Sequence, residues 1–320
     1  KPDDLASSSS TWVKGLGMKK LLAIVDDWEK LERYAERLAP WYDVVESPFG
    51  TLGIELARDR ASELDQILVD LTFEDMTEWE AHALLRGDPR TAGLPVAFVS
   101  DSTPPKGWNP TVDRAISRPY EFEKFLASLM AGTVLRFWFG ASGRPDMDLW
   151  FGGTPEIDER IRAAFGPWVQ AAAEGRLNHW KDDRRSLLAL IILLDQFSLN
   201  IHRDQPKSFE QSALAIPLSL HAIEQGWDRD STPLERVFLY LPLEHAEDLK
   251  LQEKSVERFK ALVADAPPRD REQAEVFLDF AIKHWEVVQR FGRFPDRNPV
   301  FGRQPTREEA EYMADGGPPF

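Results

Sequence analysis

The chain has 320 residues, 42% of them hydrophobic, so it can form two globular domains. Its formal net charge of -15 argues against broad binding to nucleic acid, because that affinity comes from Lys and Arg neutralising phosphates. It contains no cysteine, which excludes disulfides, thiolate metal sites and cysteine nucleophiles and fits a reducing cytoplasm.

The chain begins with a polar, serine-rich segment. Residues 1–17 have no signal-peptide core, so we expect a flexible leader, with Met18 as a natural start. The longest apolar run is "LLALIILL" at 187–194, well short of the ~20 residues that span a bilayer. We therefore expect a buried helix there and no membrane segment.

Residues 18–130 alternate short apolar runs with amphipathic segments. The runs expected to form strands are "LLAIV" (21–25), "DVVES" (43–47), "DQILVDL" (65–71), "PVAFVS" (95–100) and "RAISR" (114–118). Helical spacing separates them, for example over 28–39 and 50–61. Strands that alternate with helices predict an α/β doubly wound parallel sheet.

Polar side chains stand where several of these strands end. Asp26, Asp27, Asp70 and Ser100 follow or close the first, third and fourth expected strands, and ligands of such sheets bind at the carboxyl ends of the strands. Clustered carboxylates repel one another, and a hard divalent cation relieves the repulsion through oxygen ligands. We predict an Mg2+ site here, with one aspartate able to attack a phosphoryl donor.

These residues resemble the receiver domain of bacterial response regulators. By this resemblance Asp26, Asp27 and Asp70 hold Mg2+, and Asp70, in "ILVDL", accepts a phosphoryl group from a histidine kinase or a small phosphodonor. Ser100 then binds that group, and Arg118 replaces the usual lysine. A receiver of this kind would regulate the second half of the chain.

Several departures from the receiver pattern support a second interpretation. Arg118 keeps the charge of the lysine but not its compact donor geometry. Ala115 stands at the position of the usual aromatic switch residue, and the loop after Asp70, "LTFEDMTEWE", has no proline or glycine. The domain is then a degenerate receiver used for docking or as a homodimer interface.

Residues 131–320 have helical spacing throughout. The expected helices cover 155–173, 179–197, 212–225, 233–241, 244–264, 270–291 and a short segment from about 306. Thr154 and Thr232 precede prolines as helix caps, and Gly175, Gly226 and Gly292 suit left-handed C-terminal caps. We predict an all-α domain of stacked antiparallel pairs, as a bundle or a short solenoid.

Ionisable residues occupy helix positions where the spacing places apolar ones. Asp195 directly follows the apolar run at 187–194 and shares a helix face with its apolar residues, and His284 lies on the apolar face of its expected helix. His245, Asp248 and Gln252 are expected to share one helix face, given their three- and four-residue spacing. A buried charge needs a partner, so we expect these residues to be paired.

The arginine-rich turn "RFGRFPDRNPVFGR" (290–303) can supply such partners. We expect its phenylalanines, Phe291, Phe294 and Phe301, to anchor it in the core and its arginines to neutralise Asp195, Glu247 or Asp248. Arginines in excess of these acids would form an anion pocket, because the planar guanidinium suits carboxylate and phosphate.

Residues 133–315 resemble the bacterial domain-of-unknown-function 924 family. The matching motifs are "VLRFWFG" (134–140), "LALIILLDQFSLNIHRDQP" (188–206), "FLYLPLEHAEDLKLQEKSV" (238–256) and "RFGRFPDRNPVFGR" (290–303). The resemblance implies an all-helical tetratricopeptide-like fold and pocket positions, but no reaction. Leu199 stands where the family has an arginine. The candidate ligand-binding residues are Asp195, Asn200, Arg203, Asp248, Gln252, Arg293, Arg297, Asn298 and Arg303.

Four interpretations of this pocket compete. It is a structural polar network, or it binds a small anionic ligand and acts on it, with His245 and His284 as acid–base groups. A third is a metal site formed by His245, Glu247, Asp248 and His284, although no HExxH motif supports it. The fourth is a non-enzymatic scaffold whose groove receives an acidic peptide.

Overall fold

A computed structural model describes residues 19–72, 75–100, 113–116, 122–140, 147–151 and 153–317. The expected leader, residues 1–17, and Arg118 lie outside these ranges. The chain divides into two compact units, Lys1–Tyr120 and Glu121–Phe320. The boundary expected after residue 130 falls inside α4 (Phe122–Phe139), a single apolar helix of the second unit.

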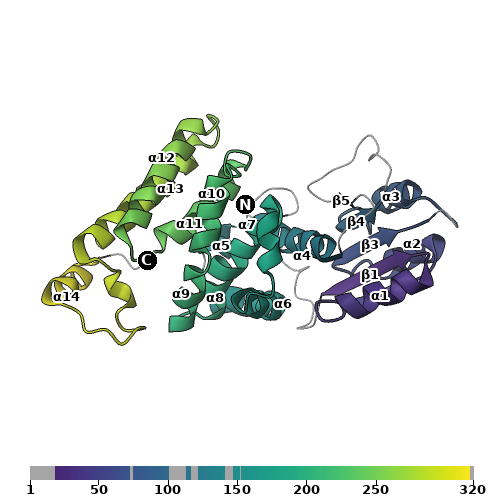
Figure 1. Cartoon of the computed structure of the whole chain (residues 1–320), viewed down its shortest axis with the longest axis horizontal. Helices are drawn as coiled ribbons and strands as arrows, with labels where there is room; N and C mark the ends of the chain where they lie inside the picture. The colour runs from purple at the N-terminus through teal and green to yellow at the C-terminus, as the bar shows by residue number, and fades with distance from the viewer. Residues whose placement is uncertain are drawn as a thin grey trace, which may run out of the picture. The chain divides into compact units, whose positions relative to one another are not determined.

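The first unit contains a parallel sheet of five strands (Figure 1). The strands are β1 (Lys20–Val25), β2 (Asp43–Ser47), β3 (Gln66–Asp70), β4 (Val96–Val99) and β5 (Asp113–Ile116). Their order in the sheet is β2-β1-β3-β4-β5, and every neighbouring pair is parallel. This is the flavodoxin-like order, so the predicted parallel sheet is confirmed.

Helices lie on both faces of this sheet. The helices are α1 (Trp28–Leu38), α2 (Gly50–Asp59) and α3 (Glu78–Gly87). Residues of α2 and α3 join Leu22, Ile67 and Val69 in one apolar cluster. Side chains of the other parity face the opposite side, where Tyr34 of α1 bonds to Asp70. The carboxyl ends of β1 and β3 therefore meet beside α1.

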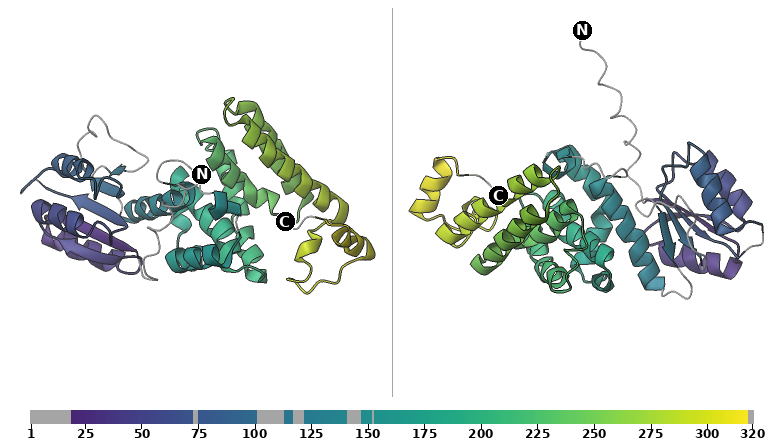
Figure 2. Two further views of the ribbon diagram at one scale, coloured as in Figure 1. Left: turned by 180° about the vertical axis from the view of Figure 1, so that it is seen from behind. Right: turned by 90° about the horizontal axis from the view of Figure 1, so that it is seen from above.

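The second unit is helical over its described residues. Its helices and turns are α4, α5 (Met147–Phe151), α6 (Pro155–Ala173), η1 (Asn178–Asp182), α7 (Arg184–Ile192), η2 (Leu193–Phe197), α8 (Ser198–Ile201), α9 (Pro206–Ala213), α10 (Ile216–Glu224), α11 (Pro233–Glu244), α12 (Leu249–Asp265), α13 (Arg271–Phe291), η3 (Pro295–Arg297) and α14 (Arg307–Ala314). The long helices α12 and α13 pack side by side (Figure 2).

Local signals set many of these helix ends as expected. Thr154 accepts a hydrogen bond from the backbone N–H of Ile157, and Thr232 forms a capping box at the start of α11. Gly175, Gly226 and Gly292 have left-handed backbone conformations, with φ of 75°, 73° and 71°. No described helix is both long and apolar enough to cross a membrane.

Two expected helices differ from the structure in ways that shape the site. The segment 179–197 is not one helix: a 3-10 turn precedes α7, and α7 continues into η2, a π-helical turn. The segment 244–264 also divides. Glu244 ends α11 and Asp248 caps α12, so the residues between them form a corner between the two helices.

Candidate functional site

In the first unit, Asp26 and Asp27 each serve local structure. Asp26 follows β1 and accepts hydrogen bonds from the backbone N–H and the hydroxyl of Thr72, at 2.6 and 2.9 Å. Asp27 is the N-cap of α1 and accepts from the backbone N–H of Lys30 at 2.9 Å. Both carboxylates have protein donors of the kind that hold loops and helix ends.

Asp70 is fully buried at the end of β3, opposite Val25 of β1. It accepts a hydrogen bond from the Tyr34 hydroxyl at 2.6 Å and forms an ion pair of 3.4 Å with Lys30. Ser100 is buried directly after β4. The strand ends thus lie at one edge of the sheet, as expected for a parallel fold.

The three aspartates are not arranged as a metal-binding group. Among the described residues, no three His, Cys, Asp or Glu side chains lie together in a way that could hold a metal ion. Asp26, Asp27 and Asp70 each face protein donors instead. The Mg2+ site at the strand ends stays a prediction, as does the metal site considered for His245, Glu247, Asp248 and His284.

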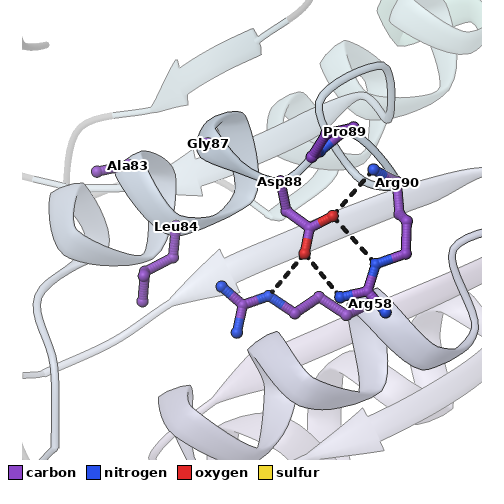
Figure 3. Close-up of a pocket in the computed structure, with 7 residues that line it drawn as sticks. All are labelled: Arg58, Ala83, Leu84, Gly87, Asp88, Pro89 and Arg90. Carbon is purple, nitrogen blue, oxygen red and sulfur yellow. Dashed lines mark hydrogen bonds and ion pairs between the residues drawn. The ribbon is translucent and has the colours of Figure 1, made fainter.

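A surface depression of the first unit lies beside the end of α3 (Figure 3). Asp88 stands between two arginines there: it pairs with Arg58 at 3.1 Å and with Arg90 at 2.7 Å. The hydrogen bonds from Arg90, and to a lesser degree the charges of both arginines, lower the pKa of Asp88 to about 2. The charges of this depression satisfy one another, which indicates a surface ion cluster rather than a reactive site.

The second unit buries a carboxylate in η2. Asp195 has no exposed surface, and it accepts hydrogen bonds from Ser212 of α9 and, at 2.6 Å, from the Gln196 amide. The π turn inserts an extra residue into the helix, a feature often found at functional sites. Burial alone would raise the pKa of Asp195, but His245 and the hydrogen bonds from Ser212 and Gln196 lower it overall.

The strongest partner of Asp195 is His245, at the C-terminal end of α11. The distance from Nδ1 of His245 to Oδ1 of Asp195 is 2.8 Å. An ionised carboxylate can only accept, so Nδ1 carries a proton, and Nε2 is the ring nitrogen left for another partner. Among the described residues Nε2 has no hydrogen-bond partner, and the side chain is 17% exposed. Asp195 and His245 therefore form a dyad with one open nitrogen.

Beside this dyad lies a second buried pair, Glu244 and His284. Nδ1 of His284 is 3.2 Å from Oε1 of Glu244 and 2.9 Å from the carbonyl oxygen of Phe280. The two imidazole rings, of His245 and His284, are 6.4 Å apart. Burial, and then the charge of Asp195, raise the pKa of Glu244 to about 8. Burial lowers the pKa of His284 to about 3, so both groups are neutral near pH 7.

Sequence reasoning missed Glu244. Its signal was present, because Val237, Tyr240 and Glu244 follow each other at helical spacing on the buried face of α11. The helix expected from the sequence covered 233–241, so Glu244 was not assigned to the same buried face as Val237 and Tyr240.

Arg297 joins the same cluster from the arginine-rich turn. Its guanidinium is centred 4.2 Å from the Phe294 ring and 4.5 Å from the Phe209 ring. It donates one side-chain hydrogen bond, of 2.8 Å, to the carbonyl oxygen of His245, and its Nε has no partner among the described residues. Arg297 is 5% exposed, and burial lowers its pKa to about 10, so it stays charged.

The other arginines of the turn are matched by acids. Arg293 pairs with Glu309 at 2.6 Å, and Arg303 pairs with Glu247 at 2.9 and 2.8 Å. The hydrogen bond from Arg293 is the main reason that the pKa of Glu309 falls to about 2. The amide of Asn298 also bonds to Glu309. Arg293 and Arg303 therefore each have an acidic partner, whereas the side chain of Arg297 bonds to a backbone carbonyl oxygen.

The remaining candidate residues have structural contacts. Asp248 caps α12, and the amide of Gln252 donates to the carbonyl oxygens of Glu244 and Ala246. They do not share a helix face with His245, because the corner between α11 and α12 separates them.

Asn200 and Arg203 make a separate set of contacts near α8. Arg203 binds Asp158 of α6 at 2.6 and 2.8 Å, and Asn200 donates to the carbonyl oxygen of Gln196 at 2.9 Å. Arg203 is exposed. The structure therefore unites Asp195, His245, His284 and Arg297, and it leaves Arg203 outside that cluster.

The phenylalanines of the turn also have distinct positions. Phe294 is fully buried between His284 and Arg297. Phe301 packs on Phe209, with ring centres 5.6 Å apart. These rings fix the path of the turn, so the position of Arg297 is set by aromatic packing.

Comparisons with known proteins agree with the helical half of the chain. Residues 134–317 match the family described as bacterial protein of unknown function (DUF924). The chain belongs to this family. One solved structure, that of the protein of unknown function ATU0120 from Agrobacterium tumefaciens, is 32% identical with a TM-score of 0.52. The alignment covers 59% of this chain and 99% of the other. No curated protein matches.

Proposed function

We propose that the helical unit binds a small anionic molecule at Arg297 and that His245 exchanges a proton with it. The observation that supports this best is Arg297 itself. A buried guanidinium has five N–H donors, and the described residues accept one hydrogen bond from this one. A carboxylate or a phosphate is the group that satisfies such a fork.

The dyad gives this site its chemistry. Asp195 holds Nδ1–H of His245, which orients the ring and stabilises the imidazolium that forms when Nε2 takes a proton. The dyad can therefore act as a general base toward the bound molecule or toward water. The hydroxyl of Ser212 already donates to Asp195, so it is not placed as a nucleophile activated by His245.

The proximity of the two groups supports a single site. Arg297 bonds to the backbone of the residue whose ring forms the dyad, so cation and base belong to one corner of the fold. Arg293 and Arg303 are engaged by Glu309 and Glu247, which leaves Arg297 as the candidate cation of the turn.

Calorimetry of the full chain with acetate, sulfate and inorganic phosphate tests this proposal. We expect at least one of the three anions to bind to the wild type. Arg297→Lys should weaken it at least tenfold, because lysine keeps the charge but loses the planar fork. Arg307→Lys is the matched control, since Arg307 is 92% exposed and pairs with Glu311 on the surface. No binding by the wild type, or equal affinity for both variants, would contradict the proposal.

For the first unit we propose a degenerate receiver that acts by docking or dimerisation without accepting phosphate. The support comes from the contacts of Asp70. Tyr34 and Lys30 hold this carboxylate, and Asp26 and Asp27 are committed to Thr72 and to the start of α1. The order of the strands is compatible with a receiver fold.

Acetyl phosphate or beryllofluoride with Mg2+ separates the two interpretations of this unit. We expect neither reagent to change the melting temperature or the oligomeric state of the full chain. A change in the wild type that is lost in Asp70→Asn would instead support phosphorylation of Asp70.

A further inference from the structure

The short helix α9 contacts both chemical groups of the proposed site. Its Ser212 donates a hydrogen bond to Asp195, the acid of the dyad. The guanidinium of Arg297 is centred 4.5 Å from the ring of Phe209, also on α9. Ser212 and Phe209 are three positions apart, a spacing that places side chains on the same face of a helix. One face of α9 therefore touches both the acid that holds the base and the candidate cation.

These contacts form a closed loop of five residues. From Ser212 the contact loop passes to Asp195, whose Oδ1 is 2.8 Å from Nδ1 of His245. The carbonyl oxygen of His245 accepts a hydrogen bond of 2.8 Å from Arg297. Arg297 then lies over the ring of Phe209, which returns the loop to α9. The contact loop thus joins α9, η2, the corner after α11 and the arginine-rich turn.

The polar members of the contact loop are shielded from water. Asp195, Ser212 and Arg297 are all buried. Water competes little for hydrogen bonds between buried groups, and a buried polar group that loses its partner is costly. Each of these side chains therefore has little freedom to turn away from its neighbour in the loop.

The helix α9 is itself held by contacts outside the loop. The hydroxyl of Ser198 in α8 donates to the side-chain oxygen of Gln211 at 2.8 Å. The hydroxyl of Ser208 donates to the carbonyl oxygen of Gln205, also at 2.8 Å, at the start of the helix. The helix packs against α8 and η2. A helix fixed in this way can hold the side chains that its residues contact.

We infer that Ser212 and Phe209 are positioning residues of the proposed site, Ser212 for the dyad and Phe209 for Arg297. This inference rests on the proposed function, because it concerns the same base and the same cation. Without the hydroxyl of Ser212, Asp195 has one donor fewer and holds the His245 ring less firmly. Without the ring of Phe209, the guanidinium of Arg297 loses one of the two aromatic faces between which it lies.

Hydrogen exchange at Nδ1 of His245 tests the role of Ser212 without any ligand. It is measured by NMR on the full chain with 15N-labelled histidine, and the signal is identified by its absence from His245→Asn. We expect Ser212→Ala to speed this exchange about fivefold, the effect of losing one hydrogen bond. Ser208→Ala is the matched control, because it removes another buried hydroxyl of α9 that bonds to the backbone and not to the dyad.

A second variant covers the case in which Ser212→Ala does not fold. Ser212→Cys fills nearly the same volume, but its thiol is a weak hydrogen-bond donor. It should therefore also speed the exchange at Nδ1 of His245, relative to Ser208→Ala.

Exchange of the Nε proton of Arg297 tests the role of Phe209 in the same way. The signal is identified in 15N-arginine-labelled protein by its absence from Arg297→Lys. Phe209→Leu keeps an apolar side chain but has no ring face, so we expect exchange to be about threefold faster. Phe301→Leu is the matched control, since Phe301 also packs on Phe209 but its ring lies against Arg303.

The results separate this inference from the function on which it rests. Faster exchange in Ser212→Ala and in Phe209→Leu, with both controls like the wild type, supports the inference. If either variant matches its control, the inference is overturned even when the anion site is intact. If the wild type binds none of acetate, sulfate and inorganic phosphate, the proposed function fails, whereas the exchange rates still decide whether α9 holds the dyad and Arg297.

Discussion

Asp70 of the first unit and Asp195 of the second are both fully buried aspartates, yet their surroundings differ in kind. Asp70 ends a strand and is held by a tyrosine hydroxyl and a lysine. Asp195 lies in a π turn and is held by a histidine whose second nitrogen is open, with Ser212 and Gln196 as further donors. Burial of a carboxylate shows that it needs partners, and the identity of those partners decides whether it can support chemistry.

The same contrast applies to the arginines of the turn. Arg303 meets Glu247 in a two-point ion pair. Arg297 lies between two aromatic rings and bonds to a backbone carbonyl. An arginine matched by an acid stabilises the fold, whereas a buried one with spare donors can bind a ligand.

The largest expected effect is on stability, where replacing Asp195 should cost more than replacing Asp70. Asp195→Asn should lower the free energy of unfolding by about 3–5 kcal/mol, because it breaks a buried pair and leaves His245 and two donors badly matched. Asp70→Asn should lower it by about 1 kcal/mol, since Tyr34 can still donate to the amide oxygen. Urea denaturation of the full chain measures both. Equal losses would show that the partners do not distinguish these carboxylates.

A smaller effect should appear as a pH dependence of stability. The folded pKa of Glu244, about 8, lies above the ordinary value of 4.5. Between these values the unfolded chain loses the proton and the folded chain keeps it, so stability falls as the pH rises. His284 has the opposite effect on stability: between about pH 3 and pH 6.5 the unfolded chain binds its proton and the folded chain does not, so stability rises with pH. The two effects oppose each other up to pH 6.5, and above it that of Glu244 is unopposed.

Between pH 6.5 and 8 the raised pKa of Glu244 should lower the free energy of unfolding by about 2 kcal/mol. This loss corresponds to a fall of roughly 4–8 °C in the melting temperature of the helical unit. Glu244→Gln should remove the fall, and Glu286→Gln, an exposed change on α13, should retain it. Thermal melts at several pH values between 6.5 and 8.5 check this. An unchanged slope in Glu244→Gln would mean that Glu244 is ionised in the folded chain.

The smallest effect should be the same in both units. Asp27 and Asp248 each cap a helix, α1 and α12. Replacing either one by alanine should lower the free energy of unfolding by about 1 kcal/mol, because backbone N–H groups in the first turn of the helix lose their acceptor: that of Lys30 in α1, and those of Lys250 and Leu251 in α12. Neither change should alter acetate binding. Loss of binding in Asp248→Ala would place this residue in the site after all.

Much of the fold was predictable because it depends on local patterns. Strand and helix periodicity, the Thr-Pro helix starts and the glycine C-caps act within one or two turns of the chain. These signals located most elements of both units. They misplaced the end of α11, because nothing local distinguishes a helix that stops at Leu241 from one that continues to Glu244.

The candidate site was predictable in its residue types more than in its pairing. Asp195, His245 and His284 were recognisable as polar residues in apolar rows. Their partners were not, since the expected partner of Asp195 was an arginine and the structure provides His245. Pairing across the unit depends on where η2, the corner after α11 and the arginine-rich turn meet, and no single segment encodes that.

From its sequence alone, this protein is an acidic chain of a parallel sheet followed by helices, with polar residues buried in the second half. Short-range periodicity and capping determine that much. Only the tertiary structure decided which carboxylate keeps its charge, which keeps its proton and which arginine has spare donors. Those properties depend on burial and on neighbours distant in sequence, because solvation and Coulomb interactions act through space.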